Sequence, residues 1–142
     1  MSMELRIKKL HKDAKVPSYA RPGDAGMDLY ALFPVTIGAG ERAIVSTGIA
    51  IAIPEGYVGL IWDKSGLSNT FGLKVVGGVI DAGYRGEVLV GILNTSTESY
   101  VYNVGDKVAQ MLIQAVTQPK LVTVAELDIT ARGEGRFGST GV

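Results

Sequence analysis

The sequence predicts an all-β, single-domain protein with a β-barrel or jelly-roll-like fold, and three observations support this class. Short runs rich in Val and Ile alternate between two faces, as at Val88, Val90 and Ile92. Nineteen glycines are spread between these runs, well above the usual share of about 7%, which indicates many turns. A helical repeat sustained over a full-length helix occurs nowhere.

Each element follows from its own run of residues. Turn residues such as those at 54–56, 94–98 and 103–106 separate the apolar runs. One short helical turn is expected at 64–70, beside Ser65 and Gly66. No internal repeat or linker divides the chain, so we expect one body over residues 1–131 and a flexible glycine-rich tail over 132–142. The expected strands are 27–31, 35–37, 43–53, 57–62, 73–80, 87–93, 99–104, 108–116 and 121–127.

The composition excludes several classes of function. Fourteen basic residues balance fourteen acidic ones in 142 residues, which argues against nucleic acid or an anionic membrane as the main partner. The absence of cysteine excludes disulfides, iron–sulfur clusters, thiolate zinc sites and a cysteine nucleophile. A single histidine, His11, excludes a multi-histidine metal site. Any chemistry must therefore use carboxylates, hydroxyls, Lys and Arg.

The start of the sequence lacks the apolar centre of a secretory signal, and no run is long enough to span a membrane. We therefore expect a soluble, cytoplasmic protein. Six basic residues and two acids in the first 21 residues give a local charge of 6 − 2 = +4. This pattern is typical of a solvated edge strand, whose lysines discourage pairing with other chains. For His11 a surface or edge position is expected.

The tail is rich in groups that bind phosphate oxygens. Arg132, Arg136, Ser139 and Thr140 are donors, and Phe137 offers a face on which a base could stack. The glycines would let backbone N–H groups approach an anion closely. These features favour a nucleotide as ligand. The alternative is a glycine-rich chain end with incidental charges.

Two further stretches have two interpretations each. Lys64, Ser65 and Gly66 open the expected helical turn and could form a second phosphate site, or Ser65 could simply cap the helix. In residues 77–87, paired glycines could let a ring lie against backbone amides, with Asp81 at the rim of a pocket. The alternative for Asp81 is a turn residue that bonds its own backbone.

Two polar residues lie within apolar strands. Asp28 alternates with Met27 and Leu29, which can face inward, so we expect the Asp28 side chain to point outward. There it could hold a metal-bound water or pair with a basic neighbour. Gln110 lies in a strongly apolar run and could be an ordinary exposed strand residue.

Five ordered motifs together resemble the trimeric dUTP diphosphatases (dUTPases). They are AGMDLYA, DKSGLS, GVIDAGYRGEV, GDKVAQMLI and RGEGRFGSTG, and they extend from Ala25 almost to the last residue. The resemblance implies hydrolysis of dUTP to dUMP and pyrophosphate, with Mg²⁺ as the cofactor. This activity limits uracil incorporation into DNA and supplies dUMP for thymidylate synthesis. It also implies a homotrimer with three active sites, each assembled from all three chains.

The resemblance also implies roles for individual residues. Asp81 would orient and activate the attacking water, and Asp28 would support the Mg²⁺–triphosphate through water. Tyr84 would close off the space that a ribose 2′-hydroxyl needs. The tail would close over a site on another subunit, with Phe137 over the base. The implied substrate-binding residues are Lys64, Ser65, Gly66 and Gln110 for the phosphates, Gly78, Val79, Ile80 and Tyr84 for the nucleoside, and Arg132, Phe137, Gly138, Ser139 and Thr140 in the tail.

The chain departs from the commoner family pattern in three places. Lys64 stands where Arg is more frequent, which keeps the charge but loses the bidentate fork. Ala82-Gly83 replaces a pair that usually contains another acid, and Arg136 stands where glycine is common. These differences bear on affinity and on the geometry of the tail.

Two rival functions belong to different classes. A dCTP deaminase shares the fold and a similar glycine-rich hairpin, but would use a glutamate base and release ammonia. A non-catalytic nucleotide sensor would keep the pocket without the chemistry. The sequence at residues 81–84 and the complete tail motif favour the diphosphatase, and the presence of Asp81, Asp28 and Ser65 argues against the sensor.

Overall fold

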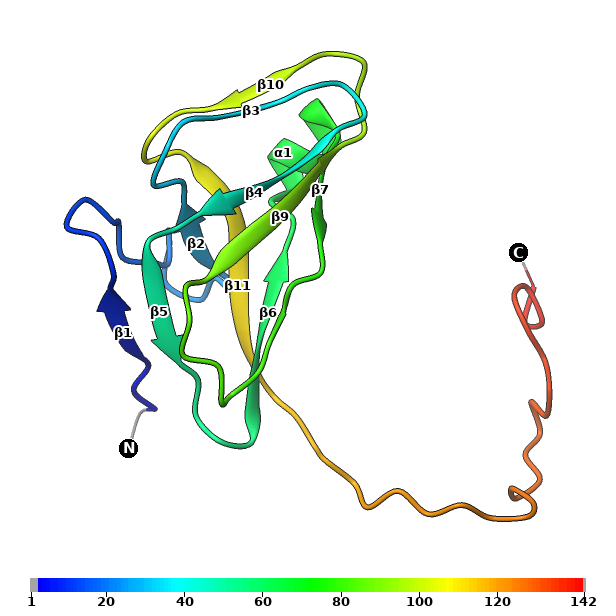
Figure 1. Cartoon of the computed structure of the whole chain (residues 1–142). Helices are drawn as coiled ribbons and strands as arrows, with labels where there is room; N and C mark the ends of the chain where they lie inside the picture. Colours follow the sequence, from blue (N-terminus) through cyan, green and yellow to red (C-terminus); the bar gives the residue numbers. More distant parts are fainter. Residues whose placement is uncertain (1–2, 142) are drawn as a thin grey trace.

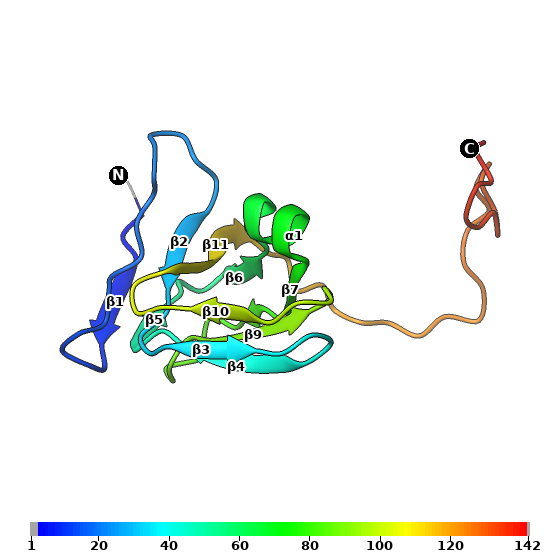
Figure 2. The same ribbon diagram turned by 90° about the horizontal axis from the view of Figure 1, so that it is seen from above.

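The computed structural model describes residues 3–141 and shows strands arranged in two layers (Figures 1 and 2). A four-stranded sheet has the order β2 (Met27–Tyr30), β11 (Lys107–Ala115), β6 (Tyr57–Trp62) and β8 (Val79–Ile80). A three-stranded sheet has the order β4 (Arg42–Ser46), β9 (Leu89–Asn94) and β7 (Leu73–Val76). Two pairs complete the body: β1 (Arg6–Lys9) with β5 (Ile49–Ala52), and β10 (Tyr100–Tyr102) with β3 (Val35–Ile37). Among the described residues the helical element is α1 (Ser65–Phe71).

The core lies between the two layers and is formed by the inward positions of the alternating strands. Val45, Val90, Ile92, Tyr102 and Met111 are all fully buried members of one hydrophobic cluster. Their strands bury one face each, as the period-two alternation predicts. The all-β, jelly-roll-like fold class is therefore confirmed.

Two of the expected strands are each divided by glycines with positive φ. The run 43–53 forms β4 and β5, separated at Thr47 and Gly48, where φ is +69°. The run 73–80 forms β7 and β8, separated by Gly77 and Gly78, with φ of +75° and +107°. In both cases the chain leaves one sheet and enters another. The prediction of continuous strands was wrong because these glycines adopt left-handed backbone conformations that a regular strand does not contain.

The ends of the chain behave differently from each other. The basic N-terminal stretch forms β1, a solvated strand that pairs antiparallel with β5, as expected. The predicted strand 121–127 is wrong, because the described chain offers it no partner. After β11, Val116 N–H donates to Gly56 O at 2.9 Å, and residues 117–131 are exposed. Figures 1 and 2 show this segment running away from the body.

The remaining elements agree closely with the sequence-based expectations. The helical turn begins one residue later than predicted, at Ser65. His11 lies in the turn after β1, where its ring packs edge-on against Phe33 at a centroid distance of 5.8 Å. Within residues 3–141, no helix is both long and apolar enough to cross a membrane.

Candidate active site

Asp28 on β2 is the centre of a charged cluster. Its Oδ1 lies 2.5 Å from Nζ of Lys64, and its Oδ2 lies 3.0 Å from Nζ of Lys107. Met27 and Leu29 lie in the core, as predicted, but Asp28 is only 2% exposed, so the face on which alternation places it is covered. The expected pairing with a basic neighbour is confirmed, with two partners instead of one. A buried carboxylate is tolerated here because two ammonium groups compensate its charge.

The cluster fixes the protonation state of this carboxylate. Burial alone would raise the pKa of Asp28, but hydrogen bonds and charges of Lys64 and Lys107 outweigh it and hold the pKa below its ordinary value. The same hydrogen bond and charge raise the pKa of Lys107. Asp28 is therefore an anion at neutral pH, flanked by two cations.

A bulge brings Lys107 to this cluster. The pairing of β11 with β2 shifts by one residue between Lys107 and Ala109. Such a bulge changes the direction of a strand side chain relative to regular alternation. Lys107 was not predicted as a site residue, and the irregular register that brings it to Asp28 cannot be read from the alternation of β11.

Gln110 lies directly beside the cluster. It pairs with Asp28 across β2 and with Trp62 across β6, so the three residues form one row of the sheet. Its Nε2 donates to Asp63 O at 2.9 Å. A side chain on buried Gly26 would collide with the Gln110 amide, so the glycine provides the space for it. Gln110 is therefore a held, half-buried residue and not an ordinary exposed one.

The start of α1 presents Ser65 and Gly66 to solvent. Lys64 is the N-cap, with φ −84° and ψ 124°, and makes no side-chain capping bond. The interpretation of Ser65 as a plain N-cap is therefore wrong, since Ser65 is the first helical residue. No hydrogen bond of its hydroxyl is found within residues 3–141. Asp63 anchors the preceding segment by accepting from Val75 N at 2.6 Å and from Lys74 Nζ at 2.8 Å.

A second group of predicted residues lies on the hairpin after β8. Gly78 is required there because a Cβ would lie 2.7 Å from Ile61 O, and Ile61 N–H donates to Gly78 O at 2.8 Å. β8 is the last strand of its sheet, so one edge of its backbone has no partner strand in the described chain. Val79 and Ile80 thus carry backbone groups on an open edge.

The hairpin surrounds a hollow of about 160 Å³, lined by Val79, Ile80, Asp81, Tyr84, Glu87 and Leu89. The backbone N–H of Tyr84 donates to Asp81 O at 3.1 Å, which closes the turn. The turn interpretation is thus correct for the Asp81 backbone. Its side chain is exposed, and no hydrogen bond or ion pair of this carboxylate is found within residues 3–141. The carboxylate is available to accept a proton from a ligand or water.

The two groups lie at opposite ends of β6 (Figure 1). Ile80 pairs with Gly59, which places Asp81 beside Val58, whereas Lys64 follows the other end of the strand. Six residues of extended chain between positions 58 and 64 correspond to about 20 Å. Within one chain, Asp81 therefore cannot act on a phosphate that Lys64 or Ser65 contacts.

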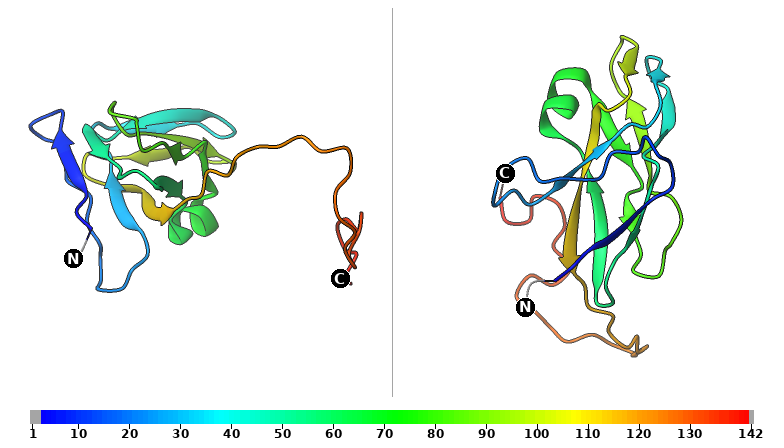
Figure 3. Two further views of the ribbon diagram at one scale, coloured as in Figure 1. Left: turned by 90° about the horizontal axis from the view of Figure 1, so that it is seen from below. Right: turned by 90° about the vertical axis from the view of Figure 1, so that its left-hand side faces the viewer.

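The tail residues lie far from both groups. Figure 2 and the left-hand view of Figure 3 show the C-terminal segment away from the sheets. Phe137 and the donors Arg132, Ser139 and Thr140 are exposed, and Gly138 has a φ of +76°. The final tail residue, Val142, lies outside the described residues.

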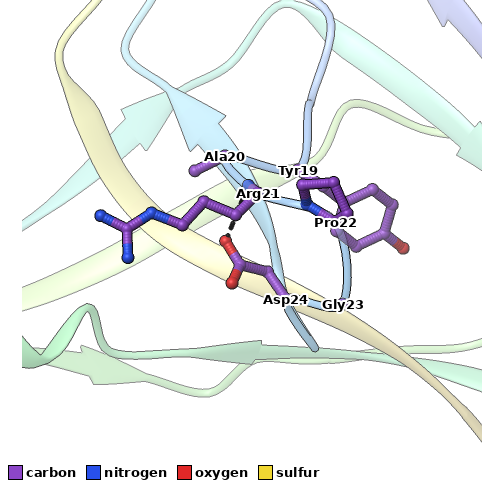
Figure 4. A pocket seen from close by; sticks show the side chains of 6 residues that line it. All are labelled: Tyr19, Ala20, Arg21, Pro22, Gly23 and Asp24. Carbon is purple, nitrogen blue, oxygen red and sulfur yellow. Dashed lines mark hydrogen bonds between the residues drawn. The ribbon is translucent and has the colours of Figure 1, made fainter.

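Another hollow, of about 450 Å³, lies in the loop 19–24 ahead of β2 (Figure 4). There Arg21 N–H donates to Oδ2 of Asp24 at 3.0 Å, while the Arg21 side chain points away from Pro22. Only residues of this one loop line it, and none is a predicted site residue. We therefore place the candidate site at the ends of β6.

The side chains around Asp28 offer few ligands for a divalent cation. No group of three or more His, Cys, Asp or Glu side chains able to hold a metal is found in the described part of the chain. Asp28 Oδ2 is buried, and its close partner within residues 3–141 is the Lys107 ammonium at 3.0 Å. An anionic oxygen with unused acceptor capacity fits a Mg²⁺ ion held mainly by phosphate and water oxygens.

Comparisons with known proteins agree with the five motifs. The dUTPase family model matches residues 12–141. The deoxyuridine 5′-triphosphate nucleotidohydrolase of Mycolicibacterium gilvum is 46% identical over 99% of this chain and 97% of its own length. The dUTPase of Staphylococcus bacteriophage 80alpha, solved with dUPNHPP, is 32% identical, with a TM-score of 0.90 over 99% of this chain and all of its own.

A further solved structure, 30% identical with a TM-score of 0.84 over 89% of this chain and all of its own, is a mutant dUTPase from phage phi11 of S. aureus. That structure reveals the coordination of a structural Mg(II) ion. The motifs, the fold and the full-length similarity lead to one conclusion. This chain belongs to the dUTPase family.

Proposed function

We propose that the chain hydrolyses dUTP to dUMP and pyrophosphate by attack of water on the α-phosphorus. The observation that carries this proposal is the Asp81 carboxylate, which has no partner within residues 3–141 and lies at the rim of a hollow that Tyr84 also lines. Asp81 orients the water and accepts its proton as the new P–O bond forms, and pyrophosphate leaves opposite. Positioning and charge neutralisation suffice for this reaction, so no covalent nucleophile is needed.

The hairpin would recognise the nucleoside. Gly78, Val79 and Ile80 place an open strand edge beside the hollow, and backbone donors and acceptors on such an edge can pair with the polar edge of uracil. The Tyr84 ring occupies the adjoining wall, where it would exclude a ribose 2′-hydroxyl by its volume.

The other end of β6 would hold the triphosphate. Lys64 supplies a positive charge, Ser65 and Gly66 an exposed hydroxyl and backbone, and Gln110 an oriented amide. Lys64 is paired with Asp28 in the free chain, so phosphate binding requires its ammonium to share or exchange partners. Lys107 keeps the carboxylate compensated when this happens.

The proposed cofactor is Mg²⁺, with Asp28 as the side chain that supports it through water. The donor chemistry of the buried Oδ2 supports this assignment. The chemistry that the bound ion supplies is neutralisation of negative charge on the phosphate oxygens.

We infer that the complete site is formed between subunits of a homotrimer. The separation of Asp81 from Lys64 in one chain requires a second chain to bring both to one nucleotide. The sheet of β4, β9 and β7 also leaves Ile44, Val76 and Leu89 exposed on its outer face. An apolar face of this kind is typical of a protein–protein interface.

Residues 132–142 would form the mobile tail and residues 1–131 the body. Arg132, Ser139 and Thr140 carry exposed donors, Arg132 bonds only within the tail in the described chain, and Phe137 is fully exposed, which supports closure over a neighbouring subunit. Deleting residues 132–142 should lower turnover by about 100-fold while the oligomer stays intact. Unchanged turnover would remove the tail from the mechanism.

The cellular consequence of this activity would be less uracil in DNA and a supply of dUMP for thymidylate synthesis, with the protein in the cytoplasm. The primary test is Mg²⁺-dependent pyrophosphate release from dUTP, UTP, dCTP and dTTP, with ammonia measured in parallel. Pyrophosphate from dUTP alone supports the proposal. Ammonia from dCTP would indicate a deaminase, and tight dUTP binding without turnover a sensor.

Site sharing can be tested by complementation. Asp81→Asn and Ser65→Ala each damage a different end of β6, so co-expression should restore activity in mixed trimers, where some sites receive both intact residues from different chains. A mass near three times the 15.0 kDa subunit, measured by light scattering, is the accompanying control. If each site lay within one chain, no mixed oligomer would contain an intact site and activity would not return.

A further inference from the structure

The phenol ring of Tyr84 folds back over its own chain. Its hydroxyl donates to Glu87 O at 2.8 Å. A Cβ added to Gly86 would lie 2.5 Å from the Tyr84 hydroxyl oxygen and 2.7 Å from Cζ. The ring therefore fills the space that any side chain at position 86 would occupy.

The backbone does not require a glycine at this position. Gly86 is not among the glycines with positive φ, so its conformation is open to alanine. The three nearest atoms that an added Cβ would meet, at 2.5 to 3.0 Å, belong to the Tyr84 side chain. What the glycine provides is thus room for this one ring.

Glu87 provides a second, fixed support. Its Oε1 accepts hydrogen bonds from Ser46 Oγ and, at 2.7 Å, from Gly48 N. The next residue is held too, since Thr47 Oγ1 donates to Val88 O at 2.6 Å. The carbonyl that receives the Tyr84 hydroxyl therefore belongs to a residue clamped to the turn between β4 and β5.

We propose that Gly86 and Glu87 are positioning residues that set the selectivity of this enzyme for deoxyribonucleotides over ribonucleotides. The inference rests on the proposed function and deepens it. The Tyr84 ring can exclude the single extra 2′-hydroxyl of a ribonucleotide only if the ring cannot move away. Tyr84 is 42% exposed, so its ring has solvent on one side and can swing outward once its support is lost.

The decisive measurement is the ratio of kcat/KM for dUTP to that for UTP in Gly86→Ala. The added methyl pushes the Tyr84 ring away from its place, so we expect this ratio to fall by about tenfold or more, mainly through a gain with UTP. Gly83→Ala is the matched control, because it is in the same loop, has no positive φ and has nothing within 4 Å of the added Cβ. It should keep the wild-type ratio.

The role of Glu87 is tested by a pair of variants. Glu87→Gln keeps an oxygen that accepts from Ser46 and Gly48, and should retain the ratio. Glu87→Ala removes that anchor and should lower the ratio in the same direction as Gly86→Ala. Calorimetric binding of dUPNHPP and of its ribonucleotide counterpart gives the same comparison without turnover, and a thermal melt checks that each variant is folded.

The two proposals fail differently. A wild-type protein that releases no pyrophosphate from dUTP contradicts the proposed function. A wild type that hydrolyses dUTP and rejects UTP, together with a folded Gly86→Ala of unchanged ratio, overturns the positioning role and leaves the function standing. Equal loss of selectivity in Gly83→Ala would also overturn it, because the effect would then not depend on the Tyr84 contact.

Discussion

The side chains at the two ends of β6 are held in place by different interactions. At the α1 end, Asp28 is buried and fixed by two ammonium groups. At the hairpin end, Asp81 is exposed and unpaired within the described chain, and Tyr84 is held by packing on a glycine and by one bond to a carbonyl. The first end is organised by charge and the second by shape.

This difference matches the tasks we propose for the two ends. A triphosphate carries several negative charges. An ammonium group that is paired with Asp28 in the free chain can bind the phosphate oxygens instead. A proton acceptor must remain free, and selectivity between two sugars depends on volume. Substitution of Asp81 at the hairpin end should therefore change mainly kcat, and substitution of Lys64 at the α1 end should change mainly KM.

The largest effect is expected for Asp81→Asn. The amide cannot accept a proton from water, so kcat should fall by about 10² to 10⁴. Affinity for dUPNHPP should stay within a few-fold of wild type, because the exposed carboxylate makes no contact in the described chain that its loss would break. Single-turnover kinetics with calorimetry separates these terms. Near-normal turnover would refute the role of Asp81.

A smaller effect is expected for Lys64→Met, at the charged end. Removing a charge-assisted contact to phosphate, worth roughly 1.5 to 3 kcal/mol, should raise KM about 10- to 100-fold. Lys12→Met is the control, since it removes the same charge from an exposed turn near β1. Should KM stay unchanged while only kcat falls, the contrast between the two ends would be wrong.

The smallest effect concerns stability. Asp28→Asn leaves Lys64 and Lys107 facing a neutral amide, so the free energy of unfolding at pH 7 should drop by roughly 1 to 3 kcal/mol. Because the pKa of folded Asp28 is lowered, its stabilisation is complete above the ordinary value of about 4 and is lost as the pH falls through the lower folded value.

Urea melts of both proteins without Mg²⁺, from pH 7 downward, test this dependence. The difference between wild type and Asp28→Asn should be constant near neutrality and shrink below about pH 4. A difference that grew on acidification would contradict the direction of the Asp28 pKa shift.

Some features of the site could be predicted from the sequence and some could not. Gly78, Asp81 and Tyr84 lie in one short stretch, so the motif itself brings them to one hairpin. Asp28, Lys64, Lys107 and Gln110 come from distant parts of the chain, and strand pairing brings them together. Alternation placed Asp28 outward because it describes one strand, whereas burial depends on what packs above that strand.

By itself, the sequence determined the all-β class, most strand positions and the five ordered motifs, because alternation, turn chemistry and motif spacing are local properties of the chain. Only the tertiary structure decided that Asp28 is buried between two lysines, that Gly86 makes room for Tyr84, and that residues 121–127 have no partner strand in the described chain. Each of these depends on contacts between residues whose neighbours in space are set by the register and the path of the chain between sheets, which no local pattern specifies.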